Sequence, residues 1–433
     1  MKHYFLKTMI LLLSICMIAL SASAGDPVKH NRDKHESPGD GDVTVKIPAG
    51  FKATLFADGL GKPRHITVSA NGIVYVKLAK KKDGNTIIRL KDNNGDGKAE
   101  EVKGFGNYTG TGIAIKNGYL YASSDEEVFR YKLDADNNVI SPDKPEKIVT
   151  GLISRGEHEA KAIALDNDGN LYVNIGAFSN SCQLKDRQKG SLGMKPCPVL
   201  DSAGGIWIFK TDKANQTYGD GERYATGLRN VVGLDWNTAT NSLFVMQHGR
   251  DQLNTIFPDM FNDLQNAELP AECMYELHKG SNCGWPYMYY DPIQHKKMLM
   301  PEYGGDGKKT GGEDAQDPVA VFPAHIAPNG LLFYTGSQFP EKYKNGAFVA
   351  FHGSWNRAPE PQKGFLVAFV PFKDGKPSGE WEVFADGFAG GPDLVASGRA
   401  KHRPCGLAQG PDGSIYVTDD QGGSIWKISY SGK

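Results

Sequence analysis

One pattern recurs along the chain and constrains its fold more than any other feature. Each copy has a short apolar strand, a turn that often contains Asn-Gly or Asp-Gly, and a second apolar strand. Such turns between apolar runs are typical of β-hairpins, because their central positions favour φ > 0. The inner strands of the six copies lie at 66–68, 113–115, 162–165, 232–234, 331–333 and 406–408.

The repeat predicts an all-β chain, and in particular a six-bladed β-propeller. Six units that share one hairpin pattern favour radial repetition of four-stranded blades. We expect the segment 51–56, which precedes the first copy, to supply the outer strand of the last blade and close the ring. Two β-sandwiches are the alternative fold. A third strand follows in several copies, at 87–90, 128–131, 206–209 and 425–428.

The composition agrees with a folded, strand-rich protein. Glycine accounts for 52 of the 433 residues, which exceeds the usual ~7% and fits a chain with many tight turns. Hydrophobic residues make up 39% of the chain, enough for a core, so the composition is not that of a disordered protein. The net charge of −1 provides no long basic field, and we therefore expect no nucleic-acid partner.

The amino terminus has the pattern of an export signal. A basic start, an apolar run at 9–20 and small residues at 22–24 predict a cleavable signal peptide over 1–24. The apolar run is shorter than the ~20 residues that a membrane anchor, the alternative, requires. We expect a flexible polar lead over 25–42, the propeller over 43–433, a periplasmic or secreted location, and no stable membrane insertion.

Export also changes how the cysteines are interpreted. In an oxidising compartment the two short spacings favour local disulfides, Cys182–Cys197 and Cys273–Cys283. Cys405 then has no partner, and we expect it to be a buried free thiol.

Two segments depart from the repeat. The longer one, about 251–320, is expected to lie between blades as a long loop region over one face. The shorter one, 92–97, has oxygen side chains at alternate positions and resembles the start of a calcium loop. Lys103 stands where an EF-hand has its closing glutamate, so a turn between blade strands is the favoured interpretation.

Residues just before the inner strands meet at one mouth of a propeller's channel. Five of the six copies carry a basic side chain there, and the copy at Thr111 does not. Because like charges repel, such a ring predicts an anionic ligand on the axis. The residues are Arg64, His65, His158, Lys161, Arg229, His325, Lys401, His402 and Arg403.

Four segments, 227–230, 247–251, 352–357 and 403–404, resemble the soluble pyrroloquinoline-quinone-dependent sugar dehydrogenases. The resemblance is closest to the sorbosone and pyranose dehydrogenase branch, and it extends over about residues 45 to 430. It implies a six-bladed propeller with the quinone (PQQ) and Ca²⁺ at the channel mouth. The three carboxylates of the quinone would then explain the ring of cations.

The resemblance implies a role for each matching position. His158 stands at the catalytic histidine, whose imidazole takes a proton from the sugar while C1 delivers hydride to the quinone. Arg229 matches the residue that stabilises the reduced quinone oxygen, which also makes it a catalytic candidate. The backbone carbonyls of Gly249 and Arg250 match the Ca²⁺ ligands. The implied quinone contacts are Arg64, Arg229, Asn230, His352, Arg357, Lys401 and Arg403.

Two positions differ from the glucose-oxidising relatives: Arg250 replaces a proline, and Thr111 replaces an amide side chain. The leading hypothesis is an exported PQQ- and Ca²⁺-dependent enzyme that oxidises an aldose or a sorbosone-like aldehyde sugar. Its electrons would pass to an external acceptor, a cytochrome or a quinone. A metal-dependent lactonase is less favoured, because its metal would require Glu, Asn and Asp ligands around the axis. The third hypothesis is a propeller that binds a protein or glycan without catalysis.

Overall fold

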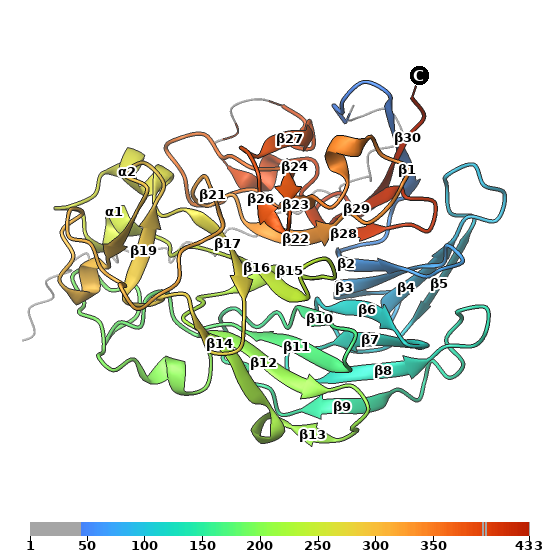
Figure 1. The fold of residues 1–433 in the computed structure, drawn as a ribbon, viewed down its shortest axis with the longest axis horizontal. Coiled ribbons are helices and arrows are strands. Elements are labelled where there is room, and N and C mark those ends of the chain that lie inside the picture. Colours follow the sequence, from blue (N-terminus) through green and yellow to red (C-terminus); the bar gives the residue numbers. More distant parts are fainter. Residues whose placement is uncertain (1–44, 392–393, 395, 433) are drawn as a thin grey trace, which may run out of the picture. The chain divides into compact units, whose positions relative to one another are not determined.

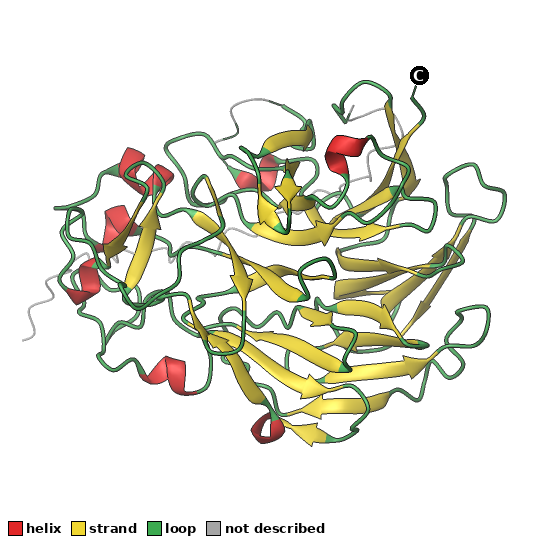
Figure 2. Ribbon diagram, viewed as in Figure 1, coloured by secondary structure: helices red, strands yellow, loops and turns green. Residues whose placement is uncertain are grey.

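The computed structural model describes residues 45–391, 394 and 396–432. The signal peptide expected at 1–24 and the lead expected at 25–42 lie outside these residues. The described strands form a six-bladed β-propeller, as the repeat predicts (Figures 1 and 2). None of the described helices is both long enough and apolar enough to cross a membrane.

The first three blades each have four antiparallel strands, and two of the blades gain a short fifth strand that pairs in parallel. Blade one consists of β2 (Pro63–Val68), β3 (Val74–Lys82), β4 (Asn85–Lys91) and β5 (Glu101–Phe105). Blade two consists of β6 (Ile113–Lys116), β7 (Tyr119–Ser123), β8 (Val128–Lys132), β9 (Glu146–Thr150) and β13 (Gln216–Thr217). Blade three consists of β10 (Ile163–Leu165), β11 (Asn170–Ile175), β12 (Gly205–Lys210), β14 (Glu222–Thr226) and β18 (Ser281–Asn282).

The last three blades have four strands each. Blade four consists of β15 (Val231–Asn237), β16 (Ser242–Gln247), β17 (Glu272–Leu277) and β21 (Ala320–Phe322). Blade five consists of β22 (Pro328–Phe333), β23 (Ala347–Phe351), β24 (Leu366–Val370) and β27 (Glu382–Ala385). Blade six consists of β28 (Pro404–Gln409), β29 (Ile415–Asp419), β30 (Ser424–Tyr430) and β1 (Phe51–Ala57).

Local turn chemistry and ring closure follow the sequence pattern. Between β6 and β7, Asn117 and Gly118 have φ values of 49° and 77°, as a two-residue type I′ turn requires. Strand β1 pairs antiparallel with β30, with Phe51 opposite Tyr430. The amino-terminal strand thus completes the last blade and covers an edge that would otherwise be unpaired.

The hydrophobic core is divided among the interfaces between neighbouring blades. Six apolar clusters each draw side chains from two adjacent blades. The cluster between blades three and four, for example, joins Tyr172 and Ile206 to Leu234 and Val245. Since every blade packs on two neighbours, the inner strands β2, β6, β10, β15, β22 and β28 are held around one axis (Figure 1).

The segment 251–320 differs from the expected loop between blades, because it lies within blade four. It contains β17, the third strand of that blade, and β18, which pairs with β14 of blade three. The remainder holds two short helices and a hairpin (Figure 1). These are α1 (Leu253–Ile256), α2 (Asp263–Glu268), β19 (Met288–Asp291) and β20 (Lys296–Leu299).

Two short strands and five 3₁₀ turns complete the strand and helix inventory of the described residues. Strands β25 (Phe372–Lys373) and β26 (Lys376–Pro377) form a small hairpin after β24. The loop at 92–97 connects β4 to β5, which confirms the turn between blade strands. The 3₁₀ turns are η1 (Pro198–Asp201), η2 (Tyr218–Asp220), η3 (Pro301–Tyr303), η4 (Glu341–Tyr343) and η5 (Ser397–Arg399).

The cysteine predictions are confirmed for one pair and wrong for the other. Cys182 and Cys197 form a disulfide, and Cys405 is a buried free thiol as expected. Cys273 and Cys283 are free. Cys273 lies in β17 of blade four, whereas Cys283 follows β18, which pairs with blade three. The short spacing therefore crosses from one blade to the next instead of closing a local loop.

Candidate active site

The candidate site is a cavity of about 260 Å³ at the mouth formed by segments that flank the inner strands. Its wall combines imidazoles, guanidinium groups and carboxyl groups in one place. A second cavity, about 330 Å³, runs among the six inner strands themselves and is lined largely by aliphatic residues. The first cavity is lined by Glu157, His158, Arg187, Arg229, His248, Gly249, Asp251, Glu272, His325, Ala327, Trp355 and Asn356.

His158 is held in an uncommon backbone conformation ahead of β10. Its φ of 51° lies in the left-handed region, which costs a non-glycine residue conformational energy. Gly176, after β11, makes the close approach possible, because a Cβ there would lie 2.6 Å from the Cβ of His158. The turn thus places this imidazole against the wall of the cavity.

The hydrogen bond of His158 sets its tautomer. The Nδ1 atom contacts the carbonyl of Ala177, which only accepts, so Nδ1 carries the ring proton and Nε2 keeps its lone pair. Among the described residues no protein group is bonded to Nε2. Burial, followed by the charge of Arg229, lowers the pKa of His158 to about 3. At neutral pH the ring is therefore neutral and able to accept a proton at Nε2.

Arg229 lies beside His158 and is bound on three sides. Its Nη2 atom is 2.7 Å from Oδ2 of Asp251, and its Nη1 atom donates to the carbonyl of Gly249 at 2.8 Å. Asn180 accepts two further bonds, each 3.1 Å, at its backbone carbonyl and its Oδ1 atom. All but 4% of the Arg229 side chain is buried. The guanidinium group consequently has one orientation, at the edge of the cavity.

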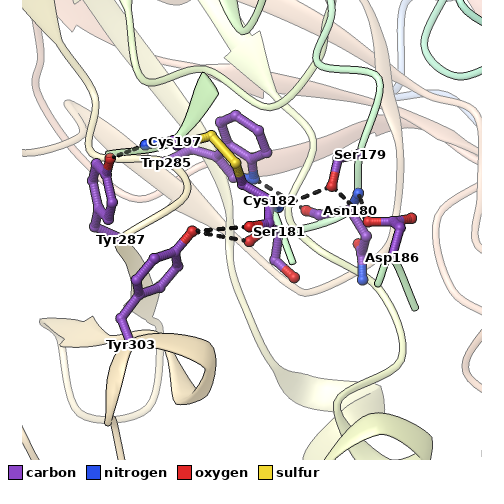
Figure 3. The surroundings of a disulfide bond; sticks show 9 residues. All are labelled: Ser179, Asn180, Ser181, Cys182, Asp186, Cys197, Trp285, Tyr287 and Tyr303. Carbon is purple, nitrogen blue, oxygen red and sulfur yellow. Dashed lines mark hydrogen bonds between the residues drawn. A yellow bond between two sulfur atoms is a disulfide. The ribbon is translucent and has the colours of Figure 1, made fainter. Parts of the chain in front are cut away.

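Arg187 approaches the same carboxylate from the loop that the disulfide closes. Its guanidinium group donates to Glu157 at 3.1 Å, to Gln252 at 2.8 Å and to Asp251 at 3.4 Å. The Oε2 atom of Glu157 is buried and has no hydrogen-bond partner in the described part of the chain. Figure 3 shows this loop at the disulfide, with Asn180 and Asp186 on one side and Tyr287 and Tyr303 on the other.

A second group of predicted site residues surrounds Asp420. Arg64 pairs with this carboxylate at 2.9 Å, and Nε2 of His352 donates to it at 2.6 Å. Arg403 donates to the carbonyls of His352 and Gly353, at 2.9 and 2.5 Å. Burial lowers the pKa of His352, although Asp420 opposes this effect. The structure thus brings together three of the predicted quinone contacts.

His248 connects the two groups electrostatically. Burial lowers its pKa to about 4, and the charges that act on it include those of Arg229 and His352. Arg64 and Arg403 stand near the starts of inner strands, as Arg229 does. Asp420 follows the second strand of its blade, as His248 does, so both groups face one mouth of the propeller. The sequence suggested a ring of cations without neighbouring acids. In the structure, carboxylates lie among these cations and reduce the repulsion between them. The charged groups are the guanidinium groups of Arg64, Arg187, Arg229 and Arg403 and the carboxylates of Glu157, Asp251 and Asp420.

The structure does not bring every predicted residue to the cavity wall. Arg357 is buried and donates to Glu268 at 2.7 Å and to the Pro361 carbonyl at 3.0 Å. Lys401 packs beside Gly390. Asn230 accepts from Asn174 at 3.3 Å, while its backbone carbonyl receives the amide of His248. Of the remaining basic residues of the predicted ring, His325 lines the cavity. The others, His65, Lys161 and His402, bind the protein itself, and the Lys161 amine donates to the Glu159 carbonyl at 2.6 Å.

The two residues proposed as metal ligands follow β16. The carbonyl of Gly249 already accepts from Arg229, and its amide donates to Glu272 at 2.9 Å. The side chain of Arg250 is turned away from the cavity and forms a fully buried pair with Glu302 at 2.5 Å. Burial raises the pKa of Glu272 to about 8, so its carboxyl group is largely protonated at neutral pH.

Sequence reasoning missed the acids and amides that hold the cations in place. Asp251 stands at the end of the segment 247–251 and carried no assigned role. Asp420 directly follows β29, close to the same mouth, which is a positional signal. The sequence gives no indication of a role for Asn180, since the pattern around it does not recur in the other blades. These residues were overlooked because they act on partners that are distant in the sequence.

The fold and the cavity together define a six-bladed propeller with a charged site at one mouth of its channel. Residues 45–431 match the family described as TrAA12-like, and the chain belongs to that family.

Two relatives in sequence and one solved structure illustrate the similarity. The chain is 22% identical over 419 residues to a pyrroloquinoline quinone-dependent sugar dehydrogenase of Hypocrea jecorina, covering 90% of this chain and 91% of that protein. It is 26% identical over 430 residues to a pyrroloquinoline quinone-dependent pyranose dehydrogenase of Coprinopsis cinerea, covering 89% of this chain but 54% of that protein. A solved Trichoderma reesei structure of Carbohydrate-Active Enzymes Family AA12 superposes with a TM-score of 0.71 at 20% identity, covering 90% and 98% of the two chains.

Proposed function

We propose that this protein is an exported, PQQ- and Ca²⁺-dependent dehydrogenase that oxidises an aldose or an aldehyde sugar. Family membership and the two named dehydrogenases among its relatives support this assignment. We also propose that its electrons pass to an external acceptor, a cytochrome or a quinone. Export follows from the pattern of residues 1–24, and amino-terminal sequencing of the mature protein tests it.

The observation that carries the proposal is the neutral, correctly protonated imidazole of His158 beside Arg229. Nε2 has the lone pair that takes the proton of a sugar hydroxyl, and the Ala177 carbonyl keeps the other ring proton in place. The fixed Arg229 guanidinium stabilises negative charge that develops on an oxygen in front of it. Bound PQQ supplies a two-electron acceptor for the hydride that leaves sugar C1.

The donor chemistry of the site fits a polycarboxylate such as PQQ. Arg403 binds backbone carbonyls, and within the described residues no carboxylate forms an ion pair with it. Arg64 pairs with the carboxylate of Asp420, and the charge of the same carboxylate also acts on Arg403. Planar guanidinium groups bind carboxylates through two parallel hydrogen bonds. We propose that Arg64, Arg229, His352 and Arg403 hold the cofactor, and that Asn230, Arg357 and Lys401 support the surrounding wall.

The oxygen atoms that line the cavity are also of the type that a hard divalent cation binds. Gly249, Asp251 and Asn356 line the same cavity, and Oδ1 of Asn356 is a buried oxygen with no hydrogen-bond partner among the described residues. Calcium prefers such oxygen ligands. We propose that the carbonyls of Gly249 and Arg250, with Asn356, hold Ca²⁺. A carbonyl oxygen has two lone pairs, so the bond from Arg229 leaves Gly249 one for a metal.

Reconstitution with PQQ and Ca²⁺ tests the proposal. We expect one quinone bound per chain, seen as a change in its absorbance, and sugar-dependent reduction of a dye. His158→Gln should keep quinone binding and lose activity about 10²- to 10⁴-fold, the usual contribution of a general base. His278→Gln, at a site where 70% of the side chain is exposed, is the matched control and should stay active. Lactone hydrolysis without quinone, or no quinone binding, would contradict the proposal.

A further inference from the structure

Asn180 forms hydrogen bonds with both members of the Arg229–Asp251 pair. Its Nδ2 atom donates to the Asp251 carbonyl at 3.0 Å, and its Oδ1 atom accepts the Asp251 amide at 2.9 Å. The same Oδ1 accepts Nη2 of Arg229, and its backbone carbonyl accepts Nε of Arg229, both at 3.1 Å. Its side chain is fully buried. One amide residue therefore orients both members of the charged pair.

The position of Asn180 is itself set by the adjacent disulfide-closed loop. Asp186, inside that loop, accepts from the amide of Asn180 at 3.0 Å and from the Ser179 hydroxyl at 2.5 Å. The Ser179 hydroxyl in turn accepts the amide of Cys182 at 2.9 Å. Figure 3 shows these bonds beside the disulfide, where the indole of Trp285 also donates to the Asn180 carbonyl at 3.1 Å.

The same loop reaches the pair a second time, through Arg187. This residue follows Asp186 and donates to the Asp251 carboxylate at 3.4 Å. Its φ of 54° is in the left-handed region, so the loop must hold it there against its own preference. Asp251 consequently receives contacts from the loop through Asn180 and through Arg187. Without the disulfide that joins its ends, the loop would loosen, and both contacts with Asp251 would weaken together.

We propose that Asn180 is a positioning residue for Arg229 and Asp251, and that the Cys182–Cys197 disulfide keeps it in place, so that reduction weakens quinone binding. The effect on the quinone rests on the proposed function, whereas the effect on Arg229 and Asp251 does not. Losing a hydrogen bond to a charged group changes an equilibrium constant by roughly ten- to a hundredfold. We expect a loss of quinone affinity in that range.

The first measurement uses the full-length protein without quinone. Amide hydrogen exchange should increase at residues 229–231 and 249–252 in Asn180→Ala, and in wild-type protein whose disulfide has been reduced. The matched control is Asn237→Ala, which removes another buried side-chain amide, at the turn end of the β15–β16 hairpin. It should leave exchange in these two segments unchanged. Unchanged exchange in both the Asn180→Ala and the reduced protein overturns the inference.

The second measurement is equilibrium binding of PQQ with Ca²⁺ present, followed by the absorbance of the quinone. Asn180→Ala should bind about tenfold or more weakly than wild type. Asn180→Asp keeps the acceptor for Arg229 and for the Asp251 amide but loses the Nδ2 donor, so it should recover part of the affinity. A uniform loss of folding would affect both variants alike. Equal affinity in wild type and Asn180→Ala also overturns the inference.

The two proposals fail in distinguishable ways. If wild-type protein does not bind PQQ, the proposed function is wrong, and the exchange measurement still decides whether Asn180 positions the pair. If wild type binds PQQ and neither exchange nor affinity responds to Asn180 or to reduction, the positioning role is wrong while the function stands. Cys182→Ser with Cys197→Ser should match the reduced wild type in both measurements.

Discussion

The Nη2 atom of Arg229 and the Oδ2 atom of Asp251 lie 2.7 Å apart at the wall of the cavity at the channel mouth, with 4% and 12% of their side chains exposed. Burial raises the pKa of Asp251, but Arg229, His325 and Arg187 outweigh it and bring the pKa to about 2. Asp251 is therefore ionised at neutral pH, and its charge requires the neighbouring cations. This dependence determines what substitutions in the pair should do.

We expect Arg229→Met to destabilise the fold by about 3 kcal/mol, because it leaves the buried Asp251 charge with weaker compensation. Adding Asp251→Asn should restore part of this loss, since no unpaired charge then remains. Denaturant unfolding of wild type, both single variants and the double variant forms the cycle that measures the coupling. Additive losses in the double variant would show that the pair is not coupled.

Gly176→Ala should impair the site while leaving the blades intact. The new Cβ would meet the Cβ and the carbonyl of His158, both at 2.6 Å, so His158 must move from its place in the wall. We expect at least a tenfold loss of sugar-dependent dye reduction in the PQQ-loaded protein, on the scale of a displaced general base. Gly219→Ala, at an exposed position where the nearest atom to an added Cβ is Oγ1 of Thr217 at 3.7 Å, is the control for adding a methyl group. Equal activity of Gly176→Ala and wild type would contradict the geometry at His158.

Stability should fall as the pH is lowered below about 6.5, in part because two imidazoles are buried in the neutral form. Burial, opposed by the Asn329 carbonyl, lowers the pKa of His65 to about 4, and that of His158 is about 3. From 6.5 down to these values the unfolded chain binds protons that the folded chain excludes, which favours unfolding. Above pH 7 neither group contributes a pH dependence.

Denaturant unfolding at about pH 7 and about pH 5 measures this effect, which amounts to roughly 1.4 kcal/mol per pH unit for each histidine. The double variant His65→Gln/His158→Gln should lose less stability over that interval than wild type. An identical decrease in both proteins would mean that other groups account for the whole acid sensitivity.

Metal removal tests the proposed oxygen donors at the cavity. After treatment with EDTA we expect weaker PQQ binding and loss of dye-linked activity, and added Ca²⁺ should restore both. Asn356→Ala removes the unpartnered oxygen and should raise the Ca²⁺ concentration needed for recovery. Full quinone binding and activity in metal-free protein would leave Gly249 and Arg250 without the proposed role.

Differential alkylation tests the cysteine assignments. Burial raises the pKa of Cys273 and of Cys405 to about 12, so neither thiol should react in the native protein at neutral pH. In denaturant, Cys273, Cys283 and Cys405 should all be modified without a reductant, and Cys182 and Cys197 only after reduction. Peptide mapping by mass spectrometry gives the result. Protection of Cys273 and Cys283 in denaturant would indicate a disulfide between them.

The blades were predictable because their signals are local. A two-residue turn such as Asn117–Gly118 and the apolar runs beside it specify a hairpin within a dozen residues. Pairing of β1 with β30 followed from a spare strand at one end and an incomplete blade at the other. Strand β17 was missed, because its blade is interrupted by long excursions on either side of it.

The candidate site was predictable only in its basic half. His158, Arg229, Arg64 and Arg403 stand before inner strands, so the repeat alone places them near one mouth. Arg357 lies in the segment 352–357, which resembles the dehydrogenase family, yet its side chain donates a hydrogen bond to Glu268 and does not line the cavity. Position along the backbone therefore indicated which residues gather at the mouth but not the direction of each side chain.

The sequence by itself determined the six hairpin units, the closing strand and the set of cations at the channel mouth, because periodicity and turn chemistry act between near neighbours. The tertiary structure decided which acid compensates each cation and which cysteines are joined. Asp420 reaches Arg64 across 356 residues, and Asn180 reaches Asp251 across 71. Such pairs form only when the ring closes, since the closed ring brings distant strand ends to one mouth and burial there makes each charge depend on its partner.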